Sequence, residues 1–287
     1  MNTVARRHIP LEKREPANRP PAHGALRRLL RAVLVERRIP HRVEQTWNRA
    51  LHSLGVTHKT IRIDGLRFQV RRLAWDEGFL RHAIEREDYT KKEFALRATD
   101  TVIDIGANIG AFAVYAAKQA SRGRVLAFEP ASDNYELLAR NAALNRLSNL
   151  TPVRAAVAGQ TGSLTLYRAS GSGAHSTMAG HLSVTTGTES VEALSLDDVF
   201  LRYRIDRCDL LKLNCEGAEF EILYSAPDAV LARIDRIAME YHATESKRQK
   251  ADALVDYLGR HGFEVIEYVD YVDLDCGFLS VRRVAGN

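Results

Sequence analysis

The chain has 287 residues, of which 45% are hydrophobic and 27% are charged, and its net charge at pH 7 is +5. Such a composition is typical of a globular protein, and the length suits one large domain with an accessory region. The cysteines number three and show no Cys-x-x-Cys spacing, which argues against a disulfide framework or a structural zinc site. No apolar run approaches the roughly 20 residues of a membrane span, and no signal peptide is recognisable, so we expect a cytoplasmic protein.

The basic charge is concentrated near the N-terminus. Residues 1–50 contain 12 Lys or Arg and 4 Asp or Glu, which gives this segment a net charge of +8 and leaves −3 for the rest. Residues 1–22 hold four prolines among polar and charged residues, which predicts a basic disordered tail. An amphipathic helix is predicted from Gly24 to Arg38 and a second helix from Pro40 to about Leu54. We expect the first helix to pack on the rest of the chain or on a second subunit. Contact with an anionic membrane surface remains an alternative.

A β-hairpin is predicted next. Residues 60–63 and 66–70 alternate apolar and polar side chains around Asp64-Gly65, a dipeptide typical of a type I′ turn. We interpret this hairpin as a lid or an edge element. Together with the helices it forms an N-terminal accessory region, residues 23–95.

The most informative segment begins at Thr101. An apolar run, Thr101–Ile105, leads into a turn bracketed by Gly106 and Gly110, and a helix-prone stretch follows from Ala111 to Lys118. This pattern is typical of a buried parallel strand that turns tightly into a helix. Glycines in the turn let the backbone approach a ligand that a β-carbon would obstruct. The segment therefore predicts a nucleotide-type pocket.

The residues around the turn indicate which nucleotide fits. Dinucleotide folds place a glycine where this chain has Asn108, and Asp104 before the turn is unfavourable to a pyrophosphate. A ligand with an ammonium and a sulfonium group gains from that acid, which points to S-adenosylmethionine rather than NAD. The next predicted strand ends at Glu129, where a carboxylate can accept hydrogen bonds from ribose hydroxyls. The predicted cofactor-binding residues are Asp104, Gly106, Ala107, Asn108, Gly110, Glu129 and Ala156.

Strands and helices alternate after this point, which predicts an α/β fold with a doubly wound, mostly parallel sheet. The predicted strands are Val153–Val157, Leu210–Leu213, Ile234–Met239, Val265–Tyr268 and Leu279–Val281, with an extra hairpin at Ser163–Tyr167. Ligands of such sheets bind at the carboxyl ends of the strands. We therefore expect Asp104, Glu129, Ala156 and Asn214 to meet at one rim.

Four ordered motifs resemble the FkbM family of S-adenosylmethionine-dependent methyltransferases. They are Asp104–Gly110, Phe128–Pro130 with its following helix, Ser195–Val199, and Leu211–Glu219, and the similarity spans roughly residues 98–270. The resemblance implies a class I methyltransferase fold, Rossmann-like, which we assign to residues 96–287. It also implies methylation of a hydroxyl on a sugar, glycan or natural product. The family usually has Asp where this chain has Asn214, and Asn cannot act as a base or bind a metal with a full charge.

An alcohol needs a base to become a good methyl acceptor, and three residues are candidates. His242 follows the fifth predicted strand, His175 lies in the polar stretch 170–177, and Glu216 follows the fourth strand. We favour His242 because the ordinary pKa of histidine, near 6.5, suits a base at neutral pH. The predicted catalytic set is His242, Glu216 and Asn214, and no metal site is expected. Glu219 is expected to cap the helix that opens at Gly217 rather than to orient the acceptor.

Two alternative functions remain open. A nucleic-acid methyltransferase could use the basic N-terminal region to bind phosphates. We consider it less favourable, because the rest of the chain has a negative net charge and lacks an Asn-Pro-Pro-Tyr-type motif. A binding module that kept the fold and lost catalysis is suggested only by Asn214. The identity of the acceptor and the oligomeric state are not specified by the sequence.

Overall fold

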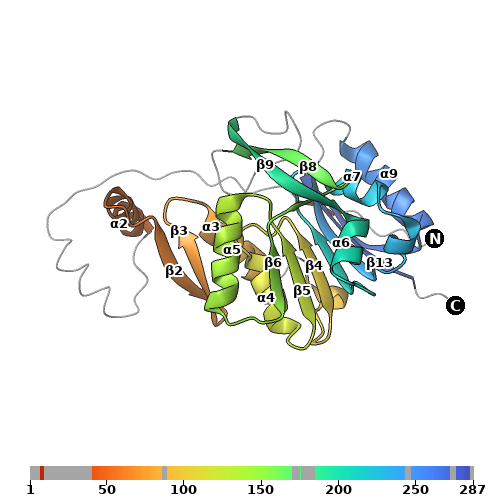
Figure 1. Cartoon of the computed structure of the whole chain (residues 1–287), viewed down its shortest axis with the longest axis horizontal. Coiled ribbons are helices and arrows are strands. Elements are labelled where there is room, and N and C mark those ends of the chain that lie inside the picture. Colours follow the sequence, from red (N-terminus) through yellow and green to blue (C-terminus); the bar gives the residue numbers. More distant parts are fainter. Residues whose placement is uncertain are drawn as a thin grey trace.

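The computed structural model describes residues 7–9, 41–85, 89–169, 175, 185–242, 247–271 and 276–284. Their central feature is an eight-stranded sheet in the order β1-β12-β13-β11-β10-β4-β5-β6 (Figure 1). The strands are β1 Arg7–Ile9, β4 Thr101–Ile105, β5 Arg124–Phe128, β6 Leu150–Val153, β10 Leu210–Leu213, β11 Arg236–His242, β12 Phe263–Tyr271 and β13 Cys276–Arg283. Strands β6, β5, β4, β10 and β11 run parallel, and β13 is antiparallel to both of its neighbours. The expected α/β fold with a mostly parallel sheet is confirmed.

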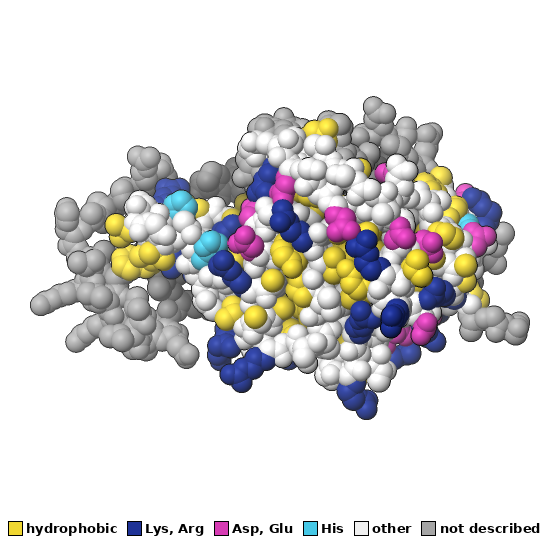
Figure 2. All heavy atoms as spheres, in the orientation of Figure 1, with side chains coloured by type: hydrophobic (Ala, Val, Ile, Leu, Met, Phe, Trp, Pro, Cys, Tyr) yellow, Lys and Arg dark blue, Asp and Glu magenta, His cyan; other side chains and the backbone are white. Residues whose placement is uncertain are grey.

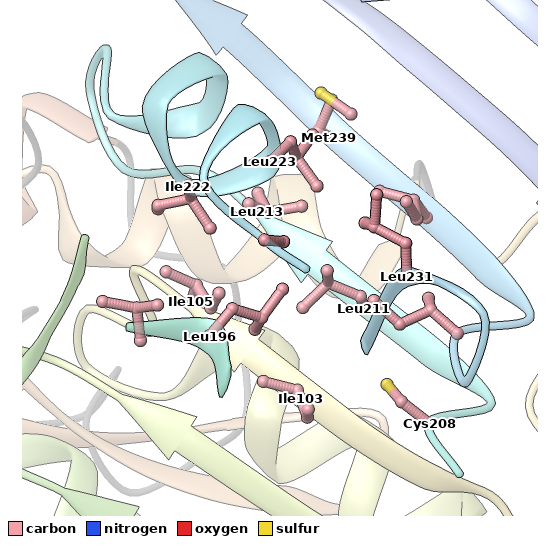
Figure 3. Close-up of a cluster of buried hydrophobic side chains, with 14 of the residues drawn as sticks. Ile103, Ile105, Leu196, Cys208, Leu211, Leu213, Ile222, Leu223, Leu231 and Met239 are labelled. Carbon is pink, nitrogen blue, oxygen red and sulfur yellow. The ribbon is translucent and has the colours of Figure 1, made fainter. Parts of the chain in front are cut away.

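Helices cover both faces of this sheet. The covering helices are α3 Asp76–Glu85, α4 Ala111–Gln119, α5 Ser132–Leu144, α6 Leu196–Arg202, α7 Glu219–Tyr224, α8 Asp228–Leu231 and α9 Lys247–Arg260, with a 3-10 turn at Lys92–Phe94. Helix α2, His41–Ser53, lies apart from the sheet at one end of the molecule (Figure 1). Successive strand residues point to opposite faces, so each strand contributes to two cores. On one face, Ile103 and Leu211 pack with residues of α6 to α9, as part of the cluster in Figure 3. On the other face, Val102 and Leu210 pack with residues of α3, α4 and α5.

The predicted hairpin is present as β2 His58–Ile63 and β3 Leu66–Arg71. Asp64 and Gly65 both have positive φ, at 47° and 74°, as a type I′ turn requires. The hairpin forms a sheet of its own and lies along α5, where the side chain of Asn141 accepts a hydrogen bond from the Gln69 backbone at 2.7 Å. It is therefore neither an edge of the main sheet nor a lid over the cavity described below.

One predicted strand is wrong. A single strand was expected over residues 153–157, but the chain leaves the main sheet after Val153, and β7 Ala156–Ala158 pairs instead with β9 Thr185–Ser195. Strand β9 also pairs with β8 Gly162–Ala169, which completes a second, three-stranded sheet. The physical reason is that residues 156–158 find their hydrogen-bond partner in β9, outside the main sheet, and the main sheet ends at β6.

The accessory region is described in part. The predicted second helix is confirmed as α2, and it exposes Trp47, while Leu54 and Val56 just beyond it are also exposed. Figure 2 shows hydrophobic side chains gathered at this end of the molecule. The predicted helix at residues 24–38 and the predicted tail, apart from β1, lie outside the described residues. In the described part of the chain, no helix has the length and apolar character needed to cross a bilayer.

Candidate active site

A cavity of about 630 Å³ opens at the carboxyl ends of the parallel strands, where such sheets bind ligands. The register of the parallel strands determines which residues lie side by side on the floor of this cavity. Ile105 is level with Phe128 on one side and with Leu213 on the other, and Leu213 is level with Met239. The residues that follow these four positions therefore form a row across β5, β4, β10 and β11, namely Glu129, Gly106, Asn214 and Glu240.

Most of the predicted site residues line this cavity. The set comprises Gly106, Ala107, Asn108, Glu129, Ala156, Asn214, Glu216 and His242. The expectation that Glu129, Ala156 and Asn214 meet at one rim is thus consistent with the structure. Asp104 and Gly110 are not part of the lining.

At position 106 the turn has room for a glycine only. A β-carbon on Gly106, whose φ is +75°, would lie 1.8 Å from the carbonyl oxygen of Asn214. The amides of Gly106 and Ala107 both donate to the carbonyl of Phe128, at 3.0 and 2.9 Å. Any side chain at position 106 would therefore separate β4 from β10 and close the floor of the cavity.

Glu129, which follows β5, contacts the glycine turn that follows the adjacent strand β4. One carboxylate oxygen accepts from the Asn108 amide at 2.8 Å, and the other accepts from the Ala131 amide at 2.9 Å. The side chain is buried, and burial raises its pKa to about 7 although these two amides favour the ionised form. Near pH 7 the Glu129 side chain is therefore partly protonated and partly ionised. A ligand that donates hydrogen bonds to it would favour the ionised form, so the proton would be released to solvent on binding.

Asp104 lies below the turn instead of facing the cavity. It shares a sheet face with Gly106 but sits two residues deeper along β4, level with Lys212, whose Nζ is 2.8 Å from its Oδ1. Both side chains are buried, and burial raises the pKa of Asp104 while Lys212 opposes that shift. Lys212 also donates to the carbonyl of Gly106 at 3.0 Å. Asp104 thus pairs with Lys212 inside the protein and does not line the cavity, and its contact with a cationic ligand stays a prediction.

Gly110 also has a packing role. Its φ is +89°, and a β-carbon there would lie 2.6 Å from the side chain of Leu138 on α5. It is the residue immediately before α4, so this glycine sets how closely α4 and α5 approach each other. Gly110 does not line the cavity, so its role as a cofactor-binding residue stays a prediction.

Asn214 connects the sheet to two other parts of the site. Its Nδ2 donates to the hydroxyl of Tyr89 at 3.2 Å and to Oε2 of Glu240 at 3.0 Å. Tyr89 belongs to the segment that follows α3, and its ring packs against Phe112 and Phe278. The amide of Asn214 therefore holds a carboxylate on the neighbouring strand.

His242 is paired with buried acid. Its Nδ1 lies 3.3 Å from Oε1 of Glu219, and its Nε2 lies 3.8 Å from Oε2 of Glu216. Burial alone would lower the pKa of His242, but the hydrogen bond to Glu219 and the charges of Glu219, Glu216 and Glu240 together raise it to about 9. At neutral pH the ring is therefore an imidazolium, so the argument for a base from its ordinary pKa does not hold here.

Glu219 also fixes the turn after β10. Its two carboxylate oxygens accept from the amides of Cys215 and Gly217, at 2.8 and 3.0 Å. The side chain is fully buried, and although burial opposes ionisation, the contacts with His242 and with the amide of Cys215 lower its pKa. Glu216, with a φ of 56°, is held at the cavity wall by this turn.

The accessory region contributes cavity residues that the sequence reasoning missed. Trp75 and Phe79 lie four residues apart at the start of α3 and are 78% and 39% exposed at the cavity wall. The ring of Trp75 rests against Gly78, where a β-carbon would be 2.9 Å away. Lys212 and Glu240 were also missed. A signal existed for both, because a lysine within an apolar strand and an acid two residues before His242 are unusual in a buried strand.

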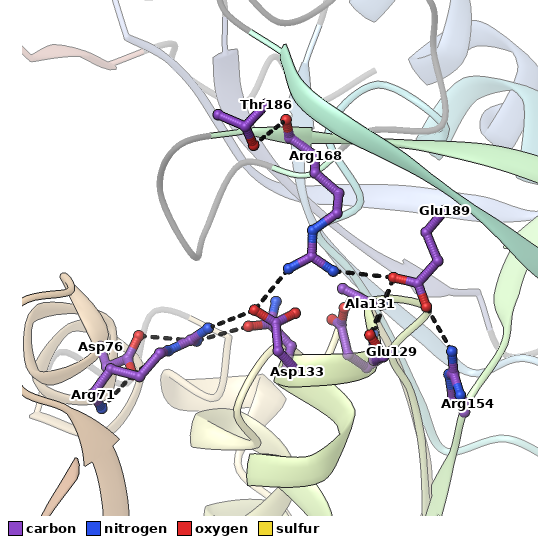
Figure 4. Close-up of polar contacts among 11 residues, drawn as sticks. Arg71, Asp76, Glu129, Ala131, Asp133, Arg154, Arg168, Thr186 and Glu189 are labelled. Carbon is purple, nitrogen blue, oxygen red and sulfur yellow. Dashed lines mark hydrogen bonds and ion pairs between the residues drawn. The ribbon is translucent and has the colours of Figure 1, made fainter. Parts of the chain in front are cut away.

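A network of ion pairs fixes the walls relative to one another. Arg71 on β3 contacts Asp76 of α3 at 2.9 Å and Asp133 of α5 at 3.2 Å. From the other side, Arg168 of β8 contacts Asp133 at 2.8 Å and Glu189 of β9 at 3.0 Å (Figure 4). The network therefore joins the hairpin, α3, α5 and the second sheet around the cavity.

His175, the described residue of the polar stretch 170–177, also lines the cavity, and burial together with Arg168 lowers its pKa. The other residues of that stretch lie outside the described residues. Ligand atoms of Glu240, His242 and Cys276 lie within 4.8 Å of one another, and the first two of these residues line the cavity. Such a donor set is chemically able to bind a divalent cation, although no metal site was expected.

Comparison with known proteins identifies the family. The family model described as "Methyltransferase FkbM domain" matches residues 104–265, which include the glycine turn, Glu129, Asn214 and His242. This chain belongs to the FkbM methyltransferase family. The predicted family is thereby confirmed, and with it the class I methyltransferase fold.

Curated relatives agree with this assignment. The 31-O-demethyl-FK506 methyltransferase FkbM of Streptomyces tacrolimicus is 27% identical over 262 residues, which cover 81% of this chain and 95% of that protein. The hexuronic acid methyltransferase AglP of Haloferax volcanii is 26% identical over 144 residues, covering 50% and 56% of the two chains. The AMB antimetabolite synthetase AmbE of Pseudomonas aeruginosa is 30% identical over 243 residues. The matched region covers 71% of this chain but only 11% of that much longer protein.

Solved structures with a related arrangement include M. jannaschii TYW2 in complex with AdoMet, with a TM-score of 0.45 and 18% identity over 79% of this chain and 87% of that one. The fibrillarin pre-rRNA processing protein of Methanococcus jannaschii has a TM-score of 0.47 and 14% identity over 80% and 84% of the two chains.

Proposed function

We propose that this FkbM-family protein transfers the methyl group of S-adenosylmethionine to a hydroxyl group on a sugar, glycan or other natural product. The observation that carries the proposal is the row of Glu129, Gly106, Asn214 and Glu240 across four adjacent strands at the cavity floor. The row supports the proposal because one line of backbone holds a carboxylate that could accept ribose hydrogen bonds, a glycine that leaves room for a ligand, and polar side chains that could bind an acceptor.

The residues of this chain fit S-adenosylmethionine. Gly106 presents no side chain where it approaches Asn214, and Glu129 stands beside it with a carboxylate oriented by two backbone amides. Glu129 would accept hydrogen bonds from the ribose hydroxyls, the turn from Gly106 to Asn108 would hold the amino-acid end, and Ala156 would belong to the apolar wall beside Glu129. When bound, S-adenosylmethionine supplies an activated methyl group on a positively charged sulfur.

The acceptor side of the proposed site lies beyond Asn214. His242, a cation at neutral pH, is placed to donate a hydrogen bond, whereas Glu216 and Glu240 are placed to accept them. Such a mixture suits a hydroxylated acceptor, because a hydroxyl both donates and accepts hydrogen bonds. The names of two relatives, a 31-O-demethyl-FK506 methyltransferase and a hexuronic acid methyltransferase, support this class of acceptor.

Two measurements test the proposal. Calorimetry should detect binding of S-adenosylmethionine and S-adenosylhomocysteine but not of NAD. The protein is then incubated with methyl-tritiated S-adenosylmethionine and fractionated extract of its source cells. We expect label in a small-molecule or glycan fraction that resists mild alkali, because methyl ethers survive alkali and methyl esters do not. Label released by ribonuclease or deoxyribonuclease would support the nucleic-acid alternative instead, and tight binding of NAD alone would refute the assignment of the cofactor.

A further inference from the structure

Glu240 lies at the β11 end of the row of residues on the cavity floor, on the side of Asn214 that we assign to the methyl acceptor. Strands are about 4.8 Å apart, so the row from Glu129 to Glu240 spans three strand spacings, or about 14 Å. Glu129 and Gly106 occupy the first half of that row, which is the part assigned above to the nucleoside and the amino-acid end. Glu240 occupies the far end, next to Asn214. It is the first carboxylate met beyond the turn.

The orientation of this carboxylate is fixed. Asn214 donates to its Oε2 at 3.0 Å and is itself held by its backbone amide, which donates to the carbonyl of Ile105 at 3.1 Å. The same Nδ2 donates to Tyr89, whose ring is packed between Phe112 and Phe278. A side-chain amide held on both sides leaves the carboxylate little rotational freedom, as a base that must meet a bound hydroxyl requires.

The neighbouring groups favour a carboxylate over the imidazole as the proton acceptor. His242 lies two residues along the same strand face, and its ring is balanced by Glu219 and approached by Glu216. Both ring nitrogens of His242 therefore face carboxylates, whereas the carboxylate of Glu240 is held by an amide donor, and a carboxylate can only accept.

From this geometry we propose that Glu240 is the catalytic residue that binds the acceptor hydroxyl and takes its proton, with Asn214 as its positioning residue. The inference rests on the proposed function. During transfer the acceptor oxygen forms a bond to the methyl carbon, and the bond from that carbon to sulfur breaks. The electron pair of the broken bond stays on sulfur, which becomes a neutral thioether, and the hydroxyl proton moves to the carboxylate of Glu240.

The test compares single variants in the tritium assay, with the labelled fraction as the acceptor. Glu240→Gln should lower kcat by about 10²–10⁴-fold, the usual contribution of a general base, while its affinity for S-adenosylhomocysteine stays within about twofold of the wild type. Glu240→Ala should lose a similar factor and regain at least about tenfold when sodium formate supplies a small carboxylate. The matched control is Glu264→Gln, which removes an exposed glutamate paired with Arg282 on the same sheet and should leave kcat unchanged.

Each other outcome has a definite meaning. Wild-type kcat in Glu240→Gln would overturn the proposal, and so would equal loss of kcat and of S-adenosylhomocysteine affinity without rescue by formate, because that pattern marks a structural residue. Abolition of wild-type turnover by a chelator, with recovery on adding Zn²⁺ or Mg²⁺, would make Glu240 a metal ligand beside His242 and Cys276 and would also overturn it. A wild-type protein that binds no S-adenosylmethionine would refute the proposed function itself.

Discussion

The raised pKa of Glu129 predicts that cofactor affinity depends on pH near neutrality. Burial raises this pKa from 4.5 to about 7, and a carboxylate that accepts ribose hydrogen bonds must be ionised. Binding to the ionised form alone multiplies the apparent Kd by the inverse of the ionised fraction. That factor is about 1.1 at pH 8 and about 11 at pH 6, so affinity should fall roughly tenfold over this range, or about 1.4 kcal/mol.

Two histidines also line the cavity. His242 has a pKa of about 9 and stays protonated between pH 6 and pH 8, whereas burial and the charge of Arg168 lower the pKa of His175. S-adenosylhomocysteine is the appropriate probe because it lacks the charge of the sulfonium. With it, the titration of Glu129 is the main proton-linked change on binding.

The measurement is calorimetry at pH 6, 7 and 8 in two buffers of different ionisation enthalpy. At pH 7 we expect release of about half a proton for each ligand bound, because roughly half of the Glu129 side chains are protonated beforehand. Glu129→Gln should bind weakly and with no pH dependence over the same range. A wild-type affinity that is flat from pH 6 to pH 8, without proton release, would refute the reasoning.

Three further predictions concern the site. Gly106→Ala should abolish binding of S-adenosylhomocysteine in a calorimetric titration, whereas Gly162→Ala, with open space around its β-carbon, should bind normally. Lys212→Met should cost about 3–5 kcal/mol in urea unfolding by leaving Asp104 buried and unpaired, and adding Asp104→Asn should recover part of that loss. Because the folded-state pKa of His242 is raised from 6.5 to about 9, its contribution to stability, on the order of 3 kcal/mol, should be complete below about pH 6.5 and lost as pH rises through about 9. The difference in unfolding free energy between wild type and His242→Gln should therefore shrink between pH 7 and pH 9.5, and a constant difference would contradict the assigned pKa.

The sequence by itself determined the local parts of the site. The strand from Thr101 to Ile105, the glycine turn and the position of Glu129 at the end of the next strand follow from short-range pattern, because apolar runs, glycines and strand-end acids act over a few residues. The rule that carboxyl ends of parallel strands meet at one edge then brought Glu129 and Asn214 together.

Only the tertiary structure decided what these residues can do. Asp104 is neutralised by Lys212, which is 108 positions away in sequence, and this pairing depends on strand order and register that no local pattern encodes. Glu240 reaches the cavity floor and contacts Asn214 because β11 lies beside β10 with Met239 level with Leu213. The pKa of a side chain is set by burial and by charges around it in space, so sequence reasoning assigned His242 an ordinary value, whereas packing against acids from other elements made it a cation.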